Sequence, residues 1–426
     1  MIFVVKNFFA YAIGNVALRA VTAIIAFMAL RIFTLAEFGV LSLVNSFVGI
    51  VPNFFNWGIR QAFGLEYFHL NSTQRRVLLN QAIAIYLLIS IPLLVICLFN
   101  THVINQIIFR NQATALIIIV ALVYCFIQFF SELYLQVLRY QMRALLLTAV
   151  QLGAAALSIL VNIFLVFYLR WGILGAICAN TFGIFVISLW GCWQYFRHKA
   201  HNFVKIDLTL NSAARSLLIT GFPFIPNILL AWILSSGNRW LLSYLTTMDH
   251  VGIFSLADMV GQMFNLCVLY PLSGSYVPYM LQQFTQHPAR AREIDRQNRK
   301  IMWLAMGAMT LVISLGVLLA YNIGPFVLPA RFLPALTYMW FILLGYIFYM
   351  GTYFSSCYLL YRKKTWLLLG VTIISAIINI VLNLVLIPLF SVWGCVFAAL
   401  IAYILFFVLN LQATSRSIQA SFQTQV

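Results

Sequence analysis

The sequence predicts an all-α polytopic membrane protein, and its composition and the pattern of its apolar runs carry this prediction. Of its 426 residues, 64% are apolar and 8% are charged, and the mean hydropathy is +0.99. A soluble domain is roughly half apolar and a quarter charged, and it does not hide this much apolar surface from water. The runs do not alternate with a period of two, so we expect helices and not the strands of a membrane barrel.

Twelve apolar runs are long enough to cross a bilayer, because a spanning helix needs roughly 20 apolar residues. The first run holds an arginine and no small-residue cleavage site, so we expect it to be a retained span. The seven cysteines all fall in such runs without metal-type spacing, and we expect them to pack, with no metal site. The runs lie at about 8–32, 39–63, 78–99, 113–138, 145–168, 172–195, 217–245, 252–283, 301–320, 334–356, 365–387 and 393–412.

The net charge of +17 is explained by topology, with no need for a nucleic-acid partner. If both termini are cytoplasmic, every lysine and most arginines fall on the inner side, as the positive-inside rule expects. The outer connections then hold only Arg31, Arg110, Arg170 and Arg331. The inner segments hold Lys6, Arg75, Arg76, Arg139, Arg143, Arg197, Lys199, Lys205, Arg215, Arg290, Arg292, Arg296, Arg299, Lys300, Arg362, Lys363, Lys364 and Arg416.

The two halves of the chain repeat each other in order and spacing. The segment Glu37–Leu43 is similar to His250–Leu256, and the Trp-Gly pair at 171–172 has a counterpart at 393–394. Six spans followed by six more, with corresponding loops on the same side, predict two pseudo-symmetric lobes around a central cavity. The predicted parts are an N-terminal lobe (1–196), a basic cytoplasmic linker (197–216), a C-terminal lobe (217–413) and a cytoplasmic tail (414–426).

Several segments resemble a known family. They are Ala29–Gly39, Val251–Ser255, Asn379–Pro388 and the Trp-Gly pair that follows. With them the chain resembles bacterial O-antigen and polysaccharide flippases of the multidrug/oligosaccharidyl-lipid/polysaccharide (MOP) exporter superfamily. The resemblance implies a MATE-like arrangement of the two lobes. The chain departs from the family at Asn238-Arg239, where relatives often carry an Asp-Arg pair.

The resemblance implies a flippase that moves undecaprenyl-pyrophosphate-linked O-antigen oligosaccharides from the cytoplasmic to the periplasmic leaflet by alternating access. It places the chain in the bacterial inner membrane, with anionic lipids, an O-antigen polymerase and a chain-length regulator as candidate partners. The sequence has no phosphate-binding glycine-rich loop, so we expect no enzymatic activity and no cofactor beyond an H⁺ or Na⁺ gradient. The alternatives are a multidrug or cation antiporter of the same superfamily, or a polysaccharide polymerase or ligase.

Three arginines lie within apolar runs, where a charge costs about 2.5–3.5 kcal/mol on insertion scales. Arg19, Arg60 and Arg239 are therefore our candidates for cavity cations that bind the pyrophosphate. The structural alternative is a buried ion pair for Arg19, and snorkelling or pairing with Glu66 for Arg60. Arg239 lies late in its run and, in this alternative, reaches the outer surface.

Two acids and two prolines complete the candidate residues. Glu132 and Asp258 lie inside spans and either bind a coupling ion or neutralise the embedded arginines. Pro223 and Pro226 interrupt the seventh span, since proline removes a backbone donor, and form either a gate or a static kink. The charged segment 286–300 is expected to be an inner loop, either as a surface helix at the headgroups or as a substrate-capture element.

Overall fold

The computed structural model describes residues 30–67, 70–141, 143–197, 212–222 and 224–423, and these ranges contain helices and no strand. Eleven helical segments in them are long and apolar enough to cross a membrane. The all-α polytopic fold is therefore confirmed. The remaining expected span, 8–32, falls outside the described residues except at its end. The eleven segments are Leu35–Asn56, Gln74–Phe99, Ala115–Tyr140, Leu145–Tyr168, Gly172–Tyr195, Ser216–Leu245, Met248–Leu269, Pro288–Val327, Ala330–Tyr361, Trp366–Phe390 and Val392–Gln419.

Polar residues at the helix starts satisfy backbone donors that have no partner inside the helix. At the start of the helix Leu35–Asn56, the Thr34 amide donates to the Glu37 carboxylate at 2.8 Å, and the Glu37 amide donates to Thr34 Oγ1 at 3.2 Å. Asn71 and Gln74 form the same reciprocal capping box at the next long helix. Such boxes fix where an apolar run begins as a helix.

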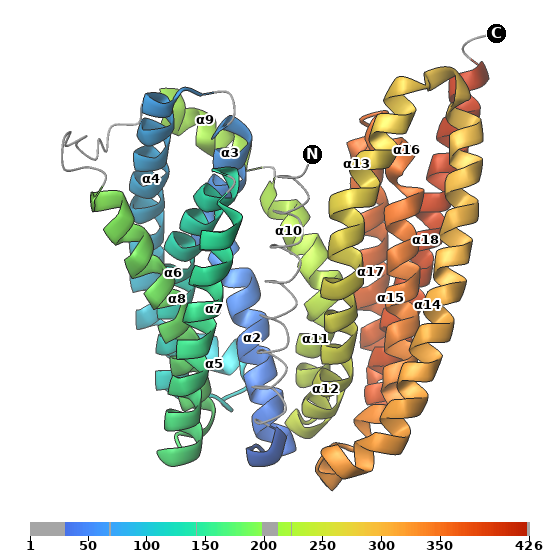
Figure 1. Ribbon diagram of the computed structural model, residues 1–426. Coiled ribbons are helices and arrows are strands. Elements are labelled where there is room, and N and C mark those ends of the chain that lie inside the picture. The colour runs from blue at the N-terminus through green and yellow to red at the C-terminus, as the bar shows by residue number, and fades with distance from the viewer. Residues whose placement is uncertain (1–29, 68–69, 142, 198–211, 223, 424–426) are drawn as a thin grey trace. The chain divides into compact units, whose positions relative to one another are not determined.

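The chain forms two compact units, Met1–Phe33 with Leu43–Leu229, and Thr34–Ser42 with Leu230–Val426. In the first unit α6 and α8 pack along each other, and α7 packs on α8 (Figure 1). Aromatic rings fill its interior, where Tyr86 stacks on Phe129 at 3.7 Å between centroids. The helices of this unit are α2 (Leu35–Asn56) from Leu43 onward, α3 (Ile59–Glu66), α4 (Ser72–Phe99), α5 (Thr101–Ile108), α6 (Ala115–Tyr140), α7 (Ala144–Asn162), the π-helical η2 (Ile163–Tyr168), α8 (Gly172–Arg197), α9 (Ser212–Gly221) and the start of α10 (Phe224–Trp232).

In the second unit, α18 packs against both α15 and α17. Glycines let aromatic rings approach the helix backbone, as where Gly351 faces the ring of Phe407 and Gly261 faces that of Tyr346. The elements of this unit are the end of α10, the π-helical η3 (Ile233–Gly237), α11 (Asn238–Leu245), α12 (Met248–Phe264), the π-helical η4 (Asn265–Leu269), α13 (Tyr270–Gln286), η5 (Pro288–Arg290), α14 (Ala291–Val327), η6 (Ala330–Phe332), α15 (Ala335–Ser355), α16 (Cys357–Tyr361), α17 (Thr365–Phe390) and α18 (Val392–Gln423).

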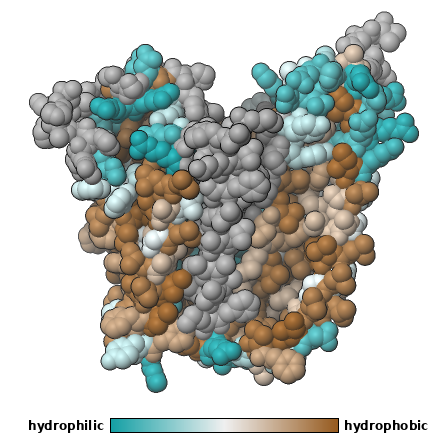
Figure 2. All heavy atoms as spheres, in the orientation of Figure 1, coloured by the Kyte–Doolittle hydropathy of each residue, from teal (hydrophilic) through white to brown (hydrophobic). Residues whose placement is uncertain are grey.

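Apolar side chains cover the outside of the described helices. Figure 2 shows brown apolar residues over the middle of the helices and teal hydrophilic residues near their ends. On α14, for example, Leu304, Leu311 and Leu315 are more than half exposed. Such an exposed apolar surface indicates contact with lipid.

The charged segment 286–300 is largely helical, in agreement with the surface-helix alternative, but it is not a separate inner connection. From Ala291 onward it is the start of the 37-residue helix α14. Buried contacts hold it there, because Asn298 Nδ2 donates to the Phe354 carbonyl at 3.0 Å and Arg299 Nη2 donates to Ser415 Oγ at 3.0 Å. In the first unit, α9 packs on α3 and α4, and the unit extends to Leu229.

Candidate functional site

Two interrupted helices meet inside the first unit. Between α2 and α3 the backbone turns at Trp57 (φ 47°) and Gly58 (φ 72°), a conformation that favours glycine. The break between α9 and α10 lies next to it, because a Cβ at Gly58 would overlap the carbonyl of Gly221. The rings of Trp57 and Phe222 stack at 6.2 Å across the same point.

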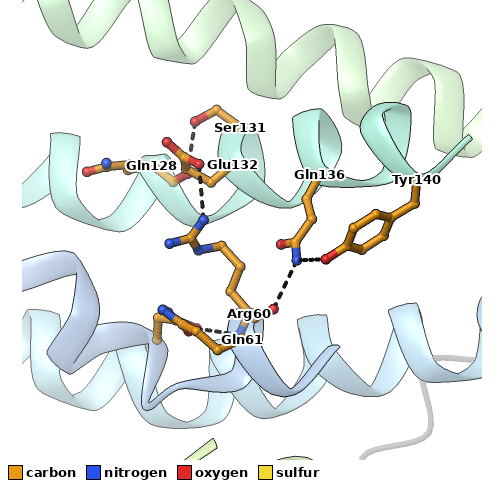
Figure 3. Close-up of polar contacts among 8 residues, drawn as sticks. Arg60, Gln61, Gln128, Ser131, Glu132, Gln136 and Tyr140 are labelled. Atoms are coloured by element: carbon orange, nitrogen blue, oxygen red, sulfur yellow. Dashed lines mark hydrogen bonds and ion pairs between the residues drawn. The ribbon is translucent and has the colours of Figure 1, made fainter. Parts of the chain in front are cut away.

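This break positions Arg60 in the first turn of α3. The Arg60 amide donates to Asn56 Oδ1 at 2.8 Å, so an α2 side chain caps the new helix. The guanidinium then extends toward α6, where Nη1 lies 3.3 Å from Glu132 Oε2 (Figure 3). The two side chains are 33% and 42% exposed. Glu132 lies in the span Ala115–Tyr140, and Arg60 lies in α3, just beyond the span Leu35–Asn56. Charged groups at such positions usually face the interior of a helix bundle or a water-filled cavity.

Glu132 belongs to a polar stripe along one face of α6. The stripe consists of Gln128, Glu132, Gln136 and Tyr140, each four residues after the last, a spacing that places them on one face. Gln136 Nε2 donates to the Arg60 carbonyl at 3.3 Å and to the Tyr140 hydroxyl at 2.6 Å (Figure 3). The side-chain oxygens of Gln128 and Gln136 are buried without a hydrogen-bond partner. The stripe therefore holds unused acceptors beside a cation.

The second unit also contains an arginine–carboxylate pair, but this one is buried. Arg239 Nη2 donates to Asp258 Oδ2, and the two side chains are only 8% and 6% exposed. Tyr346 donates to Asp258 Oδ1 at 3.2 Å, and Gln262 Nε2 donates to Oδ2 at 3.0 Å. The carboxylate thus has three donors from three helices, and Arg239 Nε has no partner. This pair is sealed within the unit.

Asparagines extend the sealed cluster. Asn383 Nδ2 donates to Asn238 Oδ1 at 2.9 Å and to the Asn379 carbonyl at 2.8 Å. The Cys395 thiol lies 3.7 Å from the Asn238 carbonyl. Asn238 thus binds an amide of α17 at the position where the sequence departs from the Asp-Arg pattern. Directly before it, η3 is a π-helical turn, a distortion that is frequent at functional sites.

The structure brings four of the seven candidate residues together as two pairs, Arg60 with Glu132 and Arg239 with Asp258. Glu66, the partner considered for Arg60, instead accepts a hydrogen bond from Ser216 Oγ at 2.5 Å. Pro226 lies in the first turn of α10, where proline is tolerated.

Arg19 and Pro223 lie outside the described residues. Within the described ranges, no group of three or more His, Cys, Asp or Glu side chains is arranged to hold a metal ion.

Sequence reasoning missed most of the polar stripe. Only Glu132 was selected, because it carries a charge, while Gln128, Gln136 and Tyr140 are ordinary residues when taken singly. The signal that identifies them is their spacing of four within an apolar run. Gly58 was also missed, since a single glycine in an apolar run does not lower its hydropathy.

Comparisons with known proteins bear on both the family and the fold. The model of a family described as polysaccharide biosynthesis protein matches residues 4–284. No curated protein matches the chain. Solved structures with the same fold include three transporters, all 14% identical to this chain. One is an inward-facing multidrug resistance MATE family transporter of the MOP superfamily, with a TM-score of 0.66 over 98% of this chain and 92% of that one. Another is the lipid II flippase MurJ in an inward closed conformation, with a TM-score of 0.67 over 92% of this chain and 87% of that one. The third is a MOP superfamily transporter from Pyrococcus furiosus, with a TM-score of 0.63 over 97% of this chain and 96% of that one.

Proposed function

Because the chain belongs to the polysaccharide biosynthesis protein family, we propose that it is a flippase for a polyprenyl-pyrophosphate-linked oligosaccharide, an O-antigen unit. The half-exposed Arg60–Glu132 pair is the observation that carries this proposal. The fold shared with the MurJ lipid II flippase supports it. In this proposal two lobes, residues 1–196 and 217–413, alternate access across the bacterial inner membrane, and the substrate enters from the cytoplasmic leaflet.

The substrate defines what the site must supply. A pyrophosphate and a sugar chain lose their hydration in hydrocarbon, and this loss is costly unless protein groups replace the water. Arg60 supplies a cation with a planar set of donors suited to phosphate oxygens. The polar stripe of α6 supplies amide groups beside it, and the unpartnered oxygens of Gln128 and Gln136 are acceptors for sugar hydroxyls. The polyprenyl tail stays in lipid.

In this proposal the pyrophosphate binds Arg60 by exchange of ion-pair partners. An exposed ion pair contributes only about 0–1 kcal/mol, so a pyrophosphate displaces Glu132 from Arg60 at little cost. The released carboxylate of Glu132 is then available to take up a proton or Na⁺. Breaking the sealed Arg239–Asp258 pair leaves a buried charge and costs about 3–5 kcal/mol. We therefore assign substrate binding to Arg60 and a supporting role to Arg239. Arg19 is a second candidate for pyrophosphate binding.

The proposal is tested by flipping of a labelled lipid-linked oligosaccharide in proteoliposomes that contain the full-length chain. Arg60→Ala is expected to lower the flipping rate at least about tenfold, the equivalent of one charge-assisted contact. Arg60→Lys should retain part of the rate because it keeps the charge. Arg139→Ala is the matched control, since Arg139 is an exposed arginine of α6 outside the stripe. Wild-type flipping by a well-folded Arg60→Ala protein would contradict the assignment.

A second candidate function is a multidrug or cation antiporter. The half-exposed Glu132 favours it, because a carboxylate at a cavity can bind a cation or proton, and the fold is shared with MATE transporters. Deletion of the gene separates the two functions. Loss of surface polysaccharide with unchanged drug susceptibility supports the flippase, and the reverse result supports the antiporter.

A further inference from the structure

A separate cavity lies within the first unit, among α4, α6, α7 and α8. Its volume is about 380 Å³, within the range of small-molecule sites. No residue of the Arg60–Glu132 pair or of the polar stripe lines it. The proposed transport path therefore leaves this cavity unexplained.

The lining is polar at one end and apolar at the other. Along α4, Arg76 is followed by Asn80 one turn deeper and by Ile83 about another turn deeper. Helix α6 shows the same gradient, from Gln141 just beyond its end to Phe130 toward its middle. The cavity therefore has the polarity of an amphiphile, with a polar head at one end and a hydrocarbon chain at the other.

The charge at the polar end has one sign. Arg76 at the start of α4 and Arg143 at the start of α7 line the cavity, and no carboxylate does so among its described lining residues. Both arginines are exposed. They belong to the segments that the positive-inside rule places in the cytoplasm. An anionic head is the complement of this end.

A buried donor lies just below the arginines. Asn80 is only 4% exposed, and its Oδ1 accepts a hydrogen bond from the Tyr195 hydroxyl. Its Nδ2 is buried with no hydrogen-bond partner. A buried donor without an acceptor is costly, and Asn80 lines the cavity about 6 Å along α4 from Arg76. A ligand acceptor one helical turn below its anionic head would satisfy this donor.

The surroundings of the cavity face lipid. Leu145 and Leu189, each next to a lining residue in sequence, are 66% and 52% exposed. Trp190 and Trp193 are also exposed on α8, and tryptophan is typical of the membrane–water interface. Exposed apolar side chains of α7 and α8 thus flank the lining residues, and we expect lipid of the adjoining leaflet to contact this surface.

We propose that this cavity binds an anionic glycerophospholipid, with its phosphate at Arg76 and Arg143, an ester carbonyl accepting from Asn80 Nδ2, and an acyl chain between Ile83 and Phe130. The ester distinguishes this lipid from a polyprenyl phosphate, which has only hydrocarbon below its phosphate and leaves Asn80 unpartnered. The two arginines distinguish it from a zwitterionic lipid.

Native mass spectrometry of the full-length protein with added phosphatidylglycerol, phosphatidylethanolamine or undecaprenyl phosphate tests the proposal. We expect phosphatidylglycerol to bind about tenfold more tightly than phosphatidylethanolamine, because each arginine near a lipid surface adds a modest electrostatic attraction. The double variant Arg76→Gln/Arg143→Gln should lose this preference, and Arg139→Gln should keep it. An unchanged preference in the double variant, or a larger loss of undecaprenyl phosphate binding than of phosphatidylglycerol binding in that variant, would overturn the proposal.

A second measurement tests the position of the lipid. Asn80→Asp keeps the acceptor for Tyr195 but removes the donor and adds a negative charge, so phosphatidylglycerol binding should fall about tenfold. Cys192 lines the cavity and is exposed. Phosphatidylglycerol should slow alkylation of Cys192 by a maleimide in the wild type and not in the Asn80→Asp variant. Equal alkylation rates with and without lipid would place the lipid elsewhere and contradict the proposal.

Discussion

Two arginine–carboxylate pairs of the same chemical type have different consequences because their exposure differs. Arg60–Glu132 is roughly one-third to two-fifths exposed, whereas Arg239–Asp258 is less than a tenth exposed and carries further hydrogen bonds from Tyr346. Water screens the first pair and weakens it. The second pair has already lost its hydration, so each partner depends on the other. The first pair is suited to exchange and the second to holding α11, α12 and α15 together.

Asp258→Asn is expected to destabilise the protein by about 3–5 kcal/mol, because it leaves the Arg239 guanidinium buried without a counter-charge. The matched change Glu132→Gln should cost less than about 1 kcal/mol, since solvent reaches Arg60. Thermal unfolding of the purified variants in detergent measures both. Replacing the pair together, as Arg239→Met/Asp258→Leu, should recover most of the loss. Equal melting temperatures for Asp258→Asn and Glu132→Gln would show that the two pairs do not differ.

Gln128→Leu is expected to leave stability unchanged or to raise it, because the Gln128 side-chain oxygen is already buried without a partner. Transport should nevertheless slow, since the proposed sugar path loses an acceptor. Gln136→Leu is the comparison: it removes donors to the Arg60 carbonyl and to Tyr140, so it should lower the melting temperature as well. Flipping assays and thermal unfolding on the same preparations separate the effects. Unchanged flipping by Gln128→Leu would exclude Gln128 from the path.

At the residue scale, the sequence identified which charges matter but not how they pair. All four charged partners are conspicuous because they stand in apolar runs. The partners are 72 and 19 residues apart in the chain, and sequence spacing carries no information about such contacts. The sequence suggested Glu66 for Arg60 because it lies close along the chain, yet Glu66 bonds to Ser216. The uncharged members of the polar stripe were recognisable only by their helical spacing.

At the scale of elements, the helix breaks are set by backbone geometry more than by hydropathy. The prolines of the seventh span drew attention to the break before α10, which the structure places after Gly221. Its counterpart at Gly58 was not predicted. The two glycines lie against each other because neither has a Cβ to separate the backbones. Close packing at this point requires both glycines, and the break at Gly58 in turn sets the direction of Arg60.

Gly58→Ala tests this requirement. The left-handed conformation costs an L-residue about 1–2 kcal/mol, and the added Cβ also meets the Gly221 carbonyl, so the apparent melting temperature should fall. Gly49→Ala is the control: Gly49 lies in α2, and a Cβ there meets nothing within 4 Å. This control should be neutral or slightly stabilising, because alanine favours the helix over glycine. Equal melting temperatures for the two variants would show that the contact between Gly58 and Gly221 does not contribute to stability.

Hydropathy does not give the full length of α14. The segment 286–300 is too polar to lie in a bilayer, and the sequence predicts an inner connection there, either a surface helix or a substrate-capture element. A helix need not end where its apolar stretch ends, and here the Asp295–Arg299 ion pair at 2.6 Å and the buried Asn298 continue it. Hydrogen bonds to Phe354 and Ser415 hold this polar part of the helix in place outside the apolar stretch. Composition predicts where a span lies, while the full length of its helix depends on tertiary contacts.

At the scale of the whole molecule, composition and the internal repeat were sufficient for the fold class. Exclusion of apolar surface from water leaves few alternatives to a helical polytopic protein. Repeated segments such as Glu37–Leu43 and His250–Leu256 predict two lobes, and this division of the chain stays a prediction. Composition does not mark the edges of the two compact units, since α9 packs into the first and Thr34–Ser42 belongs to the second. A linker is recognised by composition, but a packing boundary is not.

Orientation in the membrane is the prediction that belongs to the whole chain. The positive-inside rule places Arg170 outside and Lys363 inside, and both are exposed residues with positive φ in short connections between helices. In a chain whose own cysteines are replaced, Arg170→Cys should react with a membrane-impermeant maleimide in cells whose outer membrane alone is permeabilised. Lys363→Cys should react only after the inner membrane is also opened, because a charged reagent does not cross hydrocarbon. The opposite pattern would invert the topology and place the Arg76–Arg143 end of the lipid cavity in the periplasmic leaflet.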